Sequence, residues 1–240
     1  RIFMLLLFLT VWELFADFHI IDSFFFSSPS RVVACFVRMV SERSLFTHIG
    51  ITLTETVISF FLVALVSLSA ATLLWYSRRL SEILEPFLVV LNSLPKSALA
   101  PLLIVWLGTG MDTIIAAGIS VAIFGAIINL YTGFLQADPE KLLLIRTLGG
   151  TRRDCFFKVV LPASIPVILS NMKVNIGLSL VGVVIGEFLA ARRGLGYLII
   201  YGSQVLQLDM LITSILLLCI IAMGLYQLLQ FAEHCYKKKV

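Results

Sequence analysis

The sequence predicts an all-α membrane protein with about six transmembrane helices, and two observations predict this fold class. Hydrophobic residues make up 60% of the 240 residues and charged residues only 13%, about half of the charged share of a soluble domain. The chain also contains six apolar stretches that meet the length of about 20 residues needed to cross a bilayer. So few charges cannot cover a water-facing surface, which excludes a soluble enzyme, a disordered chain and a nucleic-acid-binding domain.

The six predicted spans form one transmembrane domain that covers residues 1–240. Their approximate ranges are 2–21, 49–76, 83–107, 111–137, 165–191 and 209–233. The second, fourth and sixth spans have long cores without any charge. Isolated ionisable residues interrupt the other three spans: Glu13, Asp17, Glu85, Lys96, Lys173 and Glu187. Because each interruption is a single side chain, we count these stretches as spans too.

The distribution of basic residues predicts the orientation. If the N-terminus is cytoplasmic, eleven basic residues lie in cytoplasmic segments: Arg1, Arg78, Arg79, Lys141, Arg146, Arg152, Arg153, Lys158, Lys237, Lys238 and Lys239. The outside segments then hold five: Arg31, Arg38, Arg43, Arg192 and Arg193. Cytoplasmic loops carry an excess of lysine and arginine, so the sequence predicts that both termini are cytoplasmic.

The predicted loop between the fourth and fifth spans, residues 138–164, is polar and organised as a helix, a glycine turn and a second helix. Asp138 is a good N-cap and Pro139 suits the first helical position. The first short helix is expected to run to Leu148. The Gly-Gly pair at 149–150 is a strong stop signal.

Thr151 is expected to cap the second short helix, Arg152–Val160, which should end before Pro162 because proline disrupts a helix interior. The loop carries a basic surface made of Lys141, Arg146, Arg152, Arg153 and Lys158. One interpretation is a solvated loop that obeys the positive-inside rule. The length and the capped helices favour the other, an element that docks onto a cytoplasmic partner.

Two segments of this loop, RTLGG at 146–150 and VVLP at 159–162, resemble the EAA loop of ABC importer permeases. That motif has a glycine, an aliphatic residue ten positions later, one further residue and then Leu-Pro. Gly149, Val159, Leu161 and Pro162 fall at these spacings.

Other segments resemble one branch of these permeases, the nitrate, sulfonate and taurine type. They are Trp12-Glu13, Ser28-Pro29-Ser30, Leu94-Pro95, Ala100-Pro101-Leu102, Trp106-Leu107-Gly108, Gly186-Glu187 and Gly194-Leu195-Gly196-Tyr197. The resemblance runs in order through nearly the whole chain.

The sequence departs from the family pattern at two places. The EAA triplet would fall on residues 143–145, which are Leu-Leu-Ile, so its glutamate is absent. Glu140 lies one helical turn earlier, and either it partly substitutes or the glutamate's contact with the ATPase is lost. Glu55 is also unexpected, because a basic residue is common there in relatives.

The resemblance implies a multi-pass permease of the bacterial inner (plasma) membrane that belongs to an ATP-driven importer. Two permease copies would pair, most simply as a homodimer, two cytoplasmic ATPases would dock below, and an extracytoplasmic binding protein would deliver the solute. The chain has no G-x-x-x-x-G-K-[ST] phosphate loop, the motif that binds nucleotide phosphates. We therefore expect no catalysis, cofactor or metal on this chain, with ATP and Mg²⁺ on the ATPase, and we expect lipid but no nucleic acid among its partners.

The resemblance also implies that residues 138–162 couple the permease to the ATPase. The residues expected to take part are Glu140, Arg146, Leu148, Gly149, Gly150, Arg152, Leu161 and Pro162. Gly149 matters because a sharp turn after a helix needs positive φ, which costs a residue with a Cβ roughly 1 kcal/mol or more.

Polar residues inside the third span are candidates for the translocation pathway. Lys96 lies near mid-span beside Asn92 and two prolines, and prolines free backbone carbonyls that are tolerated mainly where they face protein or water. A lysine there favours an anionic solute by Coulomb attraction. The alternative is that Lys96 forms a structural ion pair with Glu55 or Glu187.

Glu187, near the outer end of the fifth span, is the remaining pathway candidate. It is expected to be either a gate residue or half of an ion pair with Arg192 or Arg193. The G-x-x-x-G motif at 182–186 allows two helices to approach closely. Packing within the chain is the default interpretation, and a dimer contact is the alternative.

Two questions stay open at this point. The solute belongs to one of two classes, because importers of this branch take nitrate, sulfonates and taurine but also uncharged nitrogen heterocycles such as thiamine precursors. The alternative function is a secondary transporter driven by an ion gradient, with the coupling carboxylates Glu13, Asp17, Glu55 and Glu187. The long basic loop and the lack of an evident inverted repeat count against it.

Overall fold

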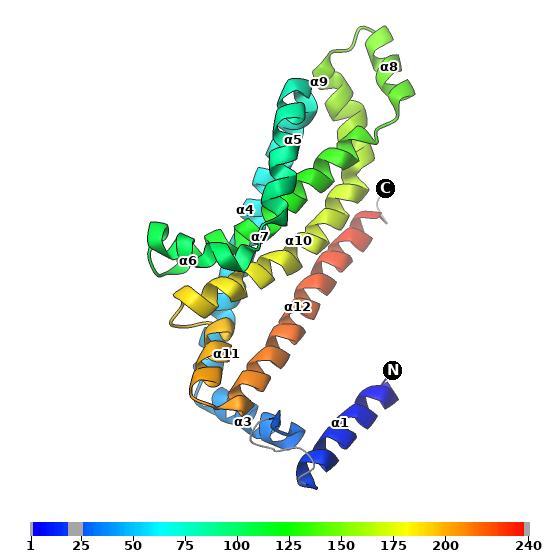
Figure 1. Ribbon diagram of the computed structural model, residues 1–240. Helices are drawn as coiled ribbons and strands as arrows, with labels where there is room; N and C mark the ends of the chain where they lie inside the picture. The colour runs from blue at the N-terminus through cyan, green and yellow to red at the C-terminus, as the bar shows by residue number, and fades with distance from the viewer. Residues whose placement is uncertain (1, 19–25, 238–240) are drawn as a thin grey trace.

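The computed structural model describes residues 2–18 and 26–237, and every regular element in these residues is a helix (Figure 1). The predicted all-α fold is confirmed. The elements are α1 (Ile2–Asp17), α3 (Pro29–Ser41), α4 (Ser44–Tyr76), α5 (Arg78–Ser93), α6 (Lys96–Leu107), α7 (Met111–Leu135), α8 (Pro139–Thr147), α9 (Arg152–Cys155), the π-helical turn η1 (Phe156–Val160), α10 (Leu161–Ala190), α11 (Leu195–Gln204) and α12 (Leu208–Lys237).

Four helices of the described residues are long and apolar enough to cross a membrane: α4, α7, the continuous helix Arg152–Ala190 and α12. α5 and α6 pass the same test only when they are counted together, which gives a fifth candidate span. The predicted first span corresponds to α1, which has 16 residues, and residues 19–21 of that prediction lie outside the described residues. The structure therefore supports four or five spans, and the count of six and the orientation stay predictions.

The predicted third span, 83–107, is wrong as a single helix. α5 and α6 differ in direction by 97°, and α6 projects sideways from the bundle in Figure 1. Leu94 is extended, with ψ 139°, as a residue before proline prefers. Pro95, which follows, has no N–H to continue α5. The sequence therefore stays apolar across the point where the helix is interrupted.

Small residues let α4, α7 and α10 pack closely in the core of the bundle. A Cβ on Gly182 of α10 would lie 2.7 Å from the carbonyl oxygen of Ala117 in α7. A Cβ on Gly118 of α7 would lie 2.6 Å from the Oγ of Ser59 in α4. Gly186 packs in the same way against Ile114. The G-x-x-x-G motif therefore serves packing within the chain, as the default interpretation predicts.

The expectation that the second loop helix ends before Pro162 is wrong. Helical structure continues from Arg152 through η1 to Ala190. η1 is a π-turn, in which hydrogen bonds skip one more residue than in an α-helix. Pro162 lies just after η1, and the shifted hydrogen bonds of the π-turn accommodate a residue that has no N–H to donate. The fifth span and the second loop helix are thus one continuous element.

Polar contacts tie the outer helices to this core. Lys173 of α10 and Glu233 of α12 form an ion pair at 2.6 Å, and these helices run side by side in Figure 1. Arg31 of α3 pairs with Asp209 of α12 at 3.1 Å. Glu13 of α1 accepts a backbone N–H from the first turn of α3 at 3.0 Å. Charged residues inside apolar helices therefore have partners on neighbouring helices.

Candidate functional site

α8 projects from the bundle at the end where α5 begins and α9 lies (Figure 1). The Asp138 side chain accepts the backbone N–H of Glu140 at 2.9 Å and caps the start of the helix. Gly149 adopts φ +81°, and the N–H of Gly150 donates to the carbonyl of Ile145 at 2.9 Å. The predicted start and glycine stop of this helix are confirmed.

The surface of α8 carries exposed leucines. The helix has no buried residue, and Leu143 and Leu144 are 62% and 57% exposed. Leu148, just after the helix, is 76% exposed. Leu142, in contrast, packs against the aromatic cluster of the bundle. An apolar surface on a polar connecting segment indicates a protein contact.

Aromatic packing anchors the second half of the loop to the bundle. The Phe156 ring lies 5.2 Å from the ring of Trp75, 5.5 Å from that of Tyr76 and 5.5 Å from that of Phe134, measured between centroids. Arg152 donates to the carbonyl oxygen of Trp75 at 3.0 Å and lies over its ring. The start of α9 is therefore fixed on the end of α4.

The predicted coupling residues fall into two groups. Glu140, Arg146, Leu148, Gly149 and Gly150 lie on α8 or directly after it, and Arg152 begins α9. Leu161 and Pro162 lie beyond η1 in the first turn of α10. The structure thus divides the motif between a projecting helix and the start of a span.

A buried polar cluster joins α4, α10 and α11 at the other end of the core. Glu187 is 0% exposed and accepts hydrogen bonds from Thr52 Oγ1 at 2.6 Å and from the N–H of Gly196 at 2.5 Å. Thr52 Oγ1 in addition accepts the N–H of Leu195 at 2.9 Å. The carboxyl group of Glu187 therefore anchors the first turn of α11.

Glu55 completes the cluster from α4. Its side chain is 2% exposed and lies close to the carboxyl group of Glu187. The Oε2 of Glu55 is buried without a hydrogen-bond partner.

Two glycines make room for the Glu187 carboxyl group. Gly194 has φ +120°, and a Cβ there would overlap that carboxyl. A Cβ at Gly196 would lie 2.8 Å from its Oε2. The Gly-x-Gly motif at 194–196 thus has a physical reason, since the turn must pass directly over a buried carboxyl group.

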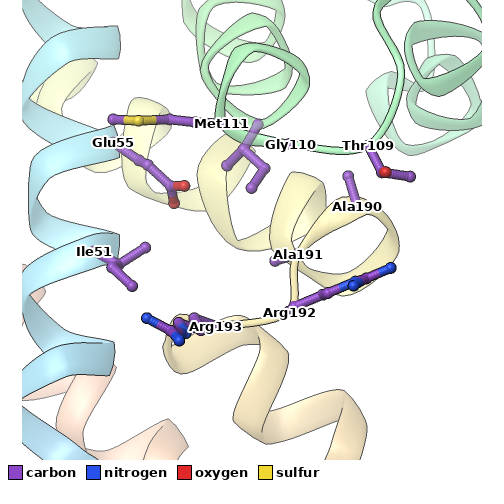
Figure 2. A pocket seen from close by; sticks show the side chains of 10 residues that line it. Ile51, Glu55, Thr109, Gly110, Met111, Ala190, Ala191, Arg192 and Arg193 are labelled. Atoms are coloured by element: carbon purple, nitrogen blue, oxygen red, sulfur yellow. The ribbon is translucent and has the colours of Figure 1, made fainter.

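An open pocket of about 400 Å³ adjoins this cluster. Figure 2 shows Glu55 reaching from α4 toward α10, while Arg192 and Arg193 extend in opposite directions from the turn after α10. The ion pairs of the described residues do not include one between Glu187 and either arginine. Of the two alternatives for Glu187, the structure does not support the ion pair, and the gate role stays a prediction.

Lys96 lies at the start of α6, directly after the break. Its ammonium group donates to the carbonyl of Leu91 and lies 5.0 Å from the centre of the Phe124 ring. The described residues show no ion pair of Lys96 with Glu55 or Glu187. That structural alternative is wrong, and the charge instead caps the end of α5.

Sequence reasoning missed Thr52 and His48 as members of the cluster. His48 Nδ1 accepts the N–H of Gly194 at 2.9 Å. His48, Thr52 and Glu55 follow one another at helical spacing along α4. A polar stripe on an otherwise apolar helix is a signal that such a helix has a polar partner.

Apolar helices around buried polar clusters, with one short helix that projects from the bundle, are the architecture of a multi-pass membrane protein. The chain belongs to the family described as the binding-protein-dependent transport system inner membrane component, whose model matches residues 63–232. Members of this family are multi-pass proteins of the inner membrane.

Named relatives agree with this family. A probable ABC transporter permease protein of Haemophilus influenzae is 30% identical over 94% of this chain and 91% of its own length. The formylaminopyrimidine transport permease of Halalkalibacterium halodurans is 28% identical over 80% of this chain and 76% of its own length. The taurine transport permease of Escherichia coli is 26% identical over 89% of this chain and 80% of its own length.

The fold also matches a solved structure. The MetNI methionine ABC transporter in an inward-facing conformation aligns with a TM-score of 0.68 at 19% identity, and the match covers 83% of this chain and 97% of that chain. These relatives are membrane subunits of ABC transporters, so membership implies an ATPase and a substrate-binding protein as partners. The alternative of an ion-driven secondary transporter has no relative among them.

Proposed function

We propose that this chain is the permease through which a small polar solute passes from a binding protein into the cytoplasm. Two copies would pair around the path, most simply as a homodimer, and two ATPases would bind at the α8 end, which is then the cytoplasmic end. ATP and Mg²⁺ would bind to the ATPases, and residues 138–162 would transmit the nucleotide state.

The projecting α8 is the observation that carries this proposal. Leu144 and Leu148 are more than half exposed on a helix whose two ends are fixed by a cap and a glycine turn. A short rigid helix with an apolar surface is suited to a cleft on another protein.

The continuity of α9 with α10 supports a route for coupling. Arg152 and Phe156 hold the start of this element against α4, and the helix then continues to Ala190 beside the buried Glu187 cluster. A displacement of α8 by the ATPase would therefore act on a single element that reaches the opposite end of the core. Such packed elements switch between discrete arrangements when a partner binds one arrangement better.

Two solute classes fit the relatives. One is an anion of the nitrate, sulfonate or taurine type, and a relative is named for taurine. The other is an uncharged nitrogen heterocycle, and a relative is named for formylaminopyrimidine. Lys96 does not decide between the classes: its charge attracts an anion, but its ammonium group already contacts Leu91 and Phe124.

Co-purification with the ATPase encoded beside this chain tests the proposal. We expect Gly149→Trp to abolish the complex, because φ +81° disfavours a bulky residue and the indole would stand at the docking helix. Gly149→Asn is the matched control and should retain the ATPase, because asparagine tolerates left-handed backbone. A Cβ at this position meets no atom within 4 Å, so neither variant adds a clash, and the melting temperature of Gly149→Trp should fall only by the small amount that about 1 kcal/mol of backbone strain causes.

Capture of equal amounts of ATPase by the wild type and Gly149→Trp would show that α8 is not the docking element. If no ATPase co-purifies with the wild type in mild detergent, the coupling proposal fails altogether.

A further inference from the structure

A polar groove of about 340 Å³ lies between α7 and α10 on the α8 side of the core. Its lining combines side-chain amides and hydroxyls with small or aliphatic residues and includes no charged side chain. The residues are Asn129, Thr132, Gly133, Gln136, Val167, Ser170, Asn171 and Val174. This volume lies in the range of about 300–1,000 Å³ typical of small-molecule pockets.

The polar residues of α7 form a stripe along one face. Asn129, Thr132 and Gln136 follow at helical spacing and are exposed. One turn before Asn129, Gly125 packs against the side chain of Asn92, the pathway candidate from α5. The stripe thus continues from the break at Leu94 toward the end that carries α8.

Hydrocarbon is an unfavourable neighbour for this face. Burying an unpaired amide or hydroxyl in an apolar medium is costly, and polar residues in spans usually face protein or a water-filled cavity. Ser170 of α10 is exposed across the groove from this stripe. Solute, water or protein is therefore a better neighbour for the groove than lipid.

Asn171 supplies an independent observation. Its Nδ2 donates to the carbonyl oxygen of Ala126 at 3.3 Å, which fixes the orientation of the amide because only nitrogen can donate. Its Oδ1 is buried without a hydrogen-bond partner, and the residue is 6% exposed. A buried acceptor without a donor is costly, and an N–H or O–H group in the groove would satisfy it.

Lys173 and Lys96, which lie near the groove in sequence or space, already have partners outside it. Lys173 follows two positions after Asn171, which places it on the other side of α10, where it pairs with Glu233 at 2.6 Å. Lys96 donates to Leu91. No charged side chain lines the groove itself, so an anion there would lose water without gaining a counter-charge in direct contact, which is unfavourable.

We propose that this groove is a solute-binding site of the permease and that it takes an uncharged nitrogen heterocycle whose N–H donates to Asn171. The proposal rests on the proposed transport function and narrows its solute to one of the two classes. Amide and hydroxyl groups match the alternating donors and acceptors of a heterocycle. A sulfonate finds no cation in the lining.

Thiol labelling of Ser170→Cys in the permease–ATPase complex, reconstituted in lipid nanodiscs, tests the site. The background carries Cys219→Ser and Cys235→Ser, because these two cysteines are exposed whereas Cys35 and Cys155 are buried. We expect neutral methyl methanethiosulfonate to react at least tenfold faster than its anionic sulfonatoethyl analogue, with both rates normalised to those on free glutathione. Ile220→Cys, on the exposed face of α12, is the lipid-facing control and should react with neither.

Protection from labelling tests the solute class. Formylaminopyrimidine should slow the labelling of Ser170→Cys at least threefold, and Asn171→Leu should abolish this protection. Taurine should not slow the reaction. Asn171→Leu must still label with the neutral reagent, which shows that the groove is intact.

Four results would overturn the assignment. Equal rates for the neutral and anionic reagents would show that the groove does not discriminate against charge. Protection by taurine would exclude a heterocycle as the solute class. The absence of protection by formylaminopyrimidine would exclude it too. If Ser170→Cys reacts with neither reagent, a second copy of the chain or lipid covers the groove. A different outcome separates this site from the proposed function. If the permease does not bind the ATPase but the isolated permease shows the same labelling pattern, the proposed function is contradicted and the site is retained.

Discussion

At the scale of single residues, Thr52 links two helices in an apolar environment. Its hydroxyl donates to Glu187 at 2.6 Å and accepts the N–H of Leu195 at 2.9 Å. Both partners are buried. One side chain therefore satisfies a carboxyl group of α10 and an otherwise free N–H at the start of α11.

We expect Thr52→Val to destabilise the permease. Valine keeps the shape but removes both hydrogen bonds, and each unsatisfied buried group costs about 1–3 kcal/mol. The measurement is the melting temperature in detergent, which should fall clearly. Thr54→Val is the matched control on the same helix, because the hydroxyl of Thr54 only returns to the carbonyl of Gly50 and is exposed. Equal melting temperatures for the two variants would contradict the role of the cluster.

At the scale of elements, α8 carries one leucine that packs on the bundle and one that is exposed. Leu142 packs on the aromatic cluster around Phe156, whereas Leu144 is 57% exposed. The two positions are close in sequence but differ in environment. A substitution at Leu142 therefore tests the stability of the fold, and one at Leu144 tests the binding of the ATPase.

We expect Leu144→Asp to reduce ATPase binding at least tenfold without lowering the melting temperature, because it places a charge only on the docking surface. Leu142→Asp should lower the melting temperature, because it buries an unpaired charge against the aromatic cluster. Titration with purified ATPase and thermal unfolding measure the two effects. Unchanged ATPase affinity in Leu144→Asp would exclude this face of α8 from the interface.

The sequence predicts elements best where the signals are local. Asp138 and Gly149 mark the start and stop of α8, and both act through neighbouring backbone groups. Leu94-Pro95 is a local signal as well, but the apolar residues on either side conceal a break of 97°. Pro162 predicts a stop that the π-turn η1 removes, because one extra residue in the turn re-registers the hydrogen bonds.

The candidate sites depend on contacts between distant segments, which periodicity and motifs do not specify. Glu55 and Glu187 meet only because α4 and α10 both pack closely against α7 through small residues. The unpaired Oδ1 of Asn171 follows from where α7 lies relative to α10. Family motifs mark such positions, as Gly194 and Gly196 do, without giving the partner.

At the scale of the whole molecule, the polar features lie in a sequence from one end to the other. The Glu187 cluster and its pocket lie at the α11 end, the neutral groove lies between α7 and α10, and α8 projects at the far end. This order fits the proposed permease, in which the solute would enter at the α11 end and the ATPase would act at the α8 end.

Uptake into vesicles tests most directly the central claim that this permease belongs to an ATP-driven importer. The complete complex is reconstituted with the binding protein encoded beside it, and uptake of the solute which that protein carries is followed with and without ATP. The account predicts uptake that requires ATP, persists when ionophores collapse the proton and sodium gradients, and falls at least tenfold with Gly149→Trp. Uptake without ATP that ionophores abolish would contradict it and would identify an ion-driven transporter instead.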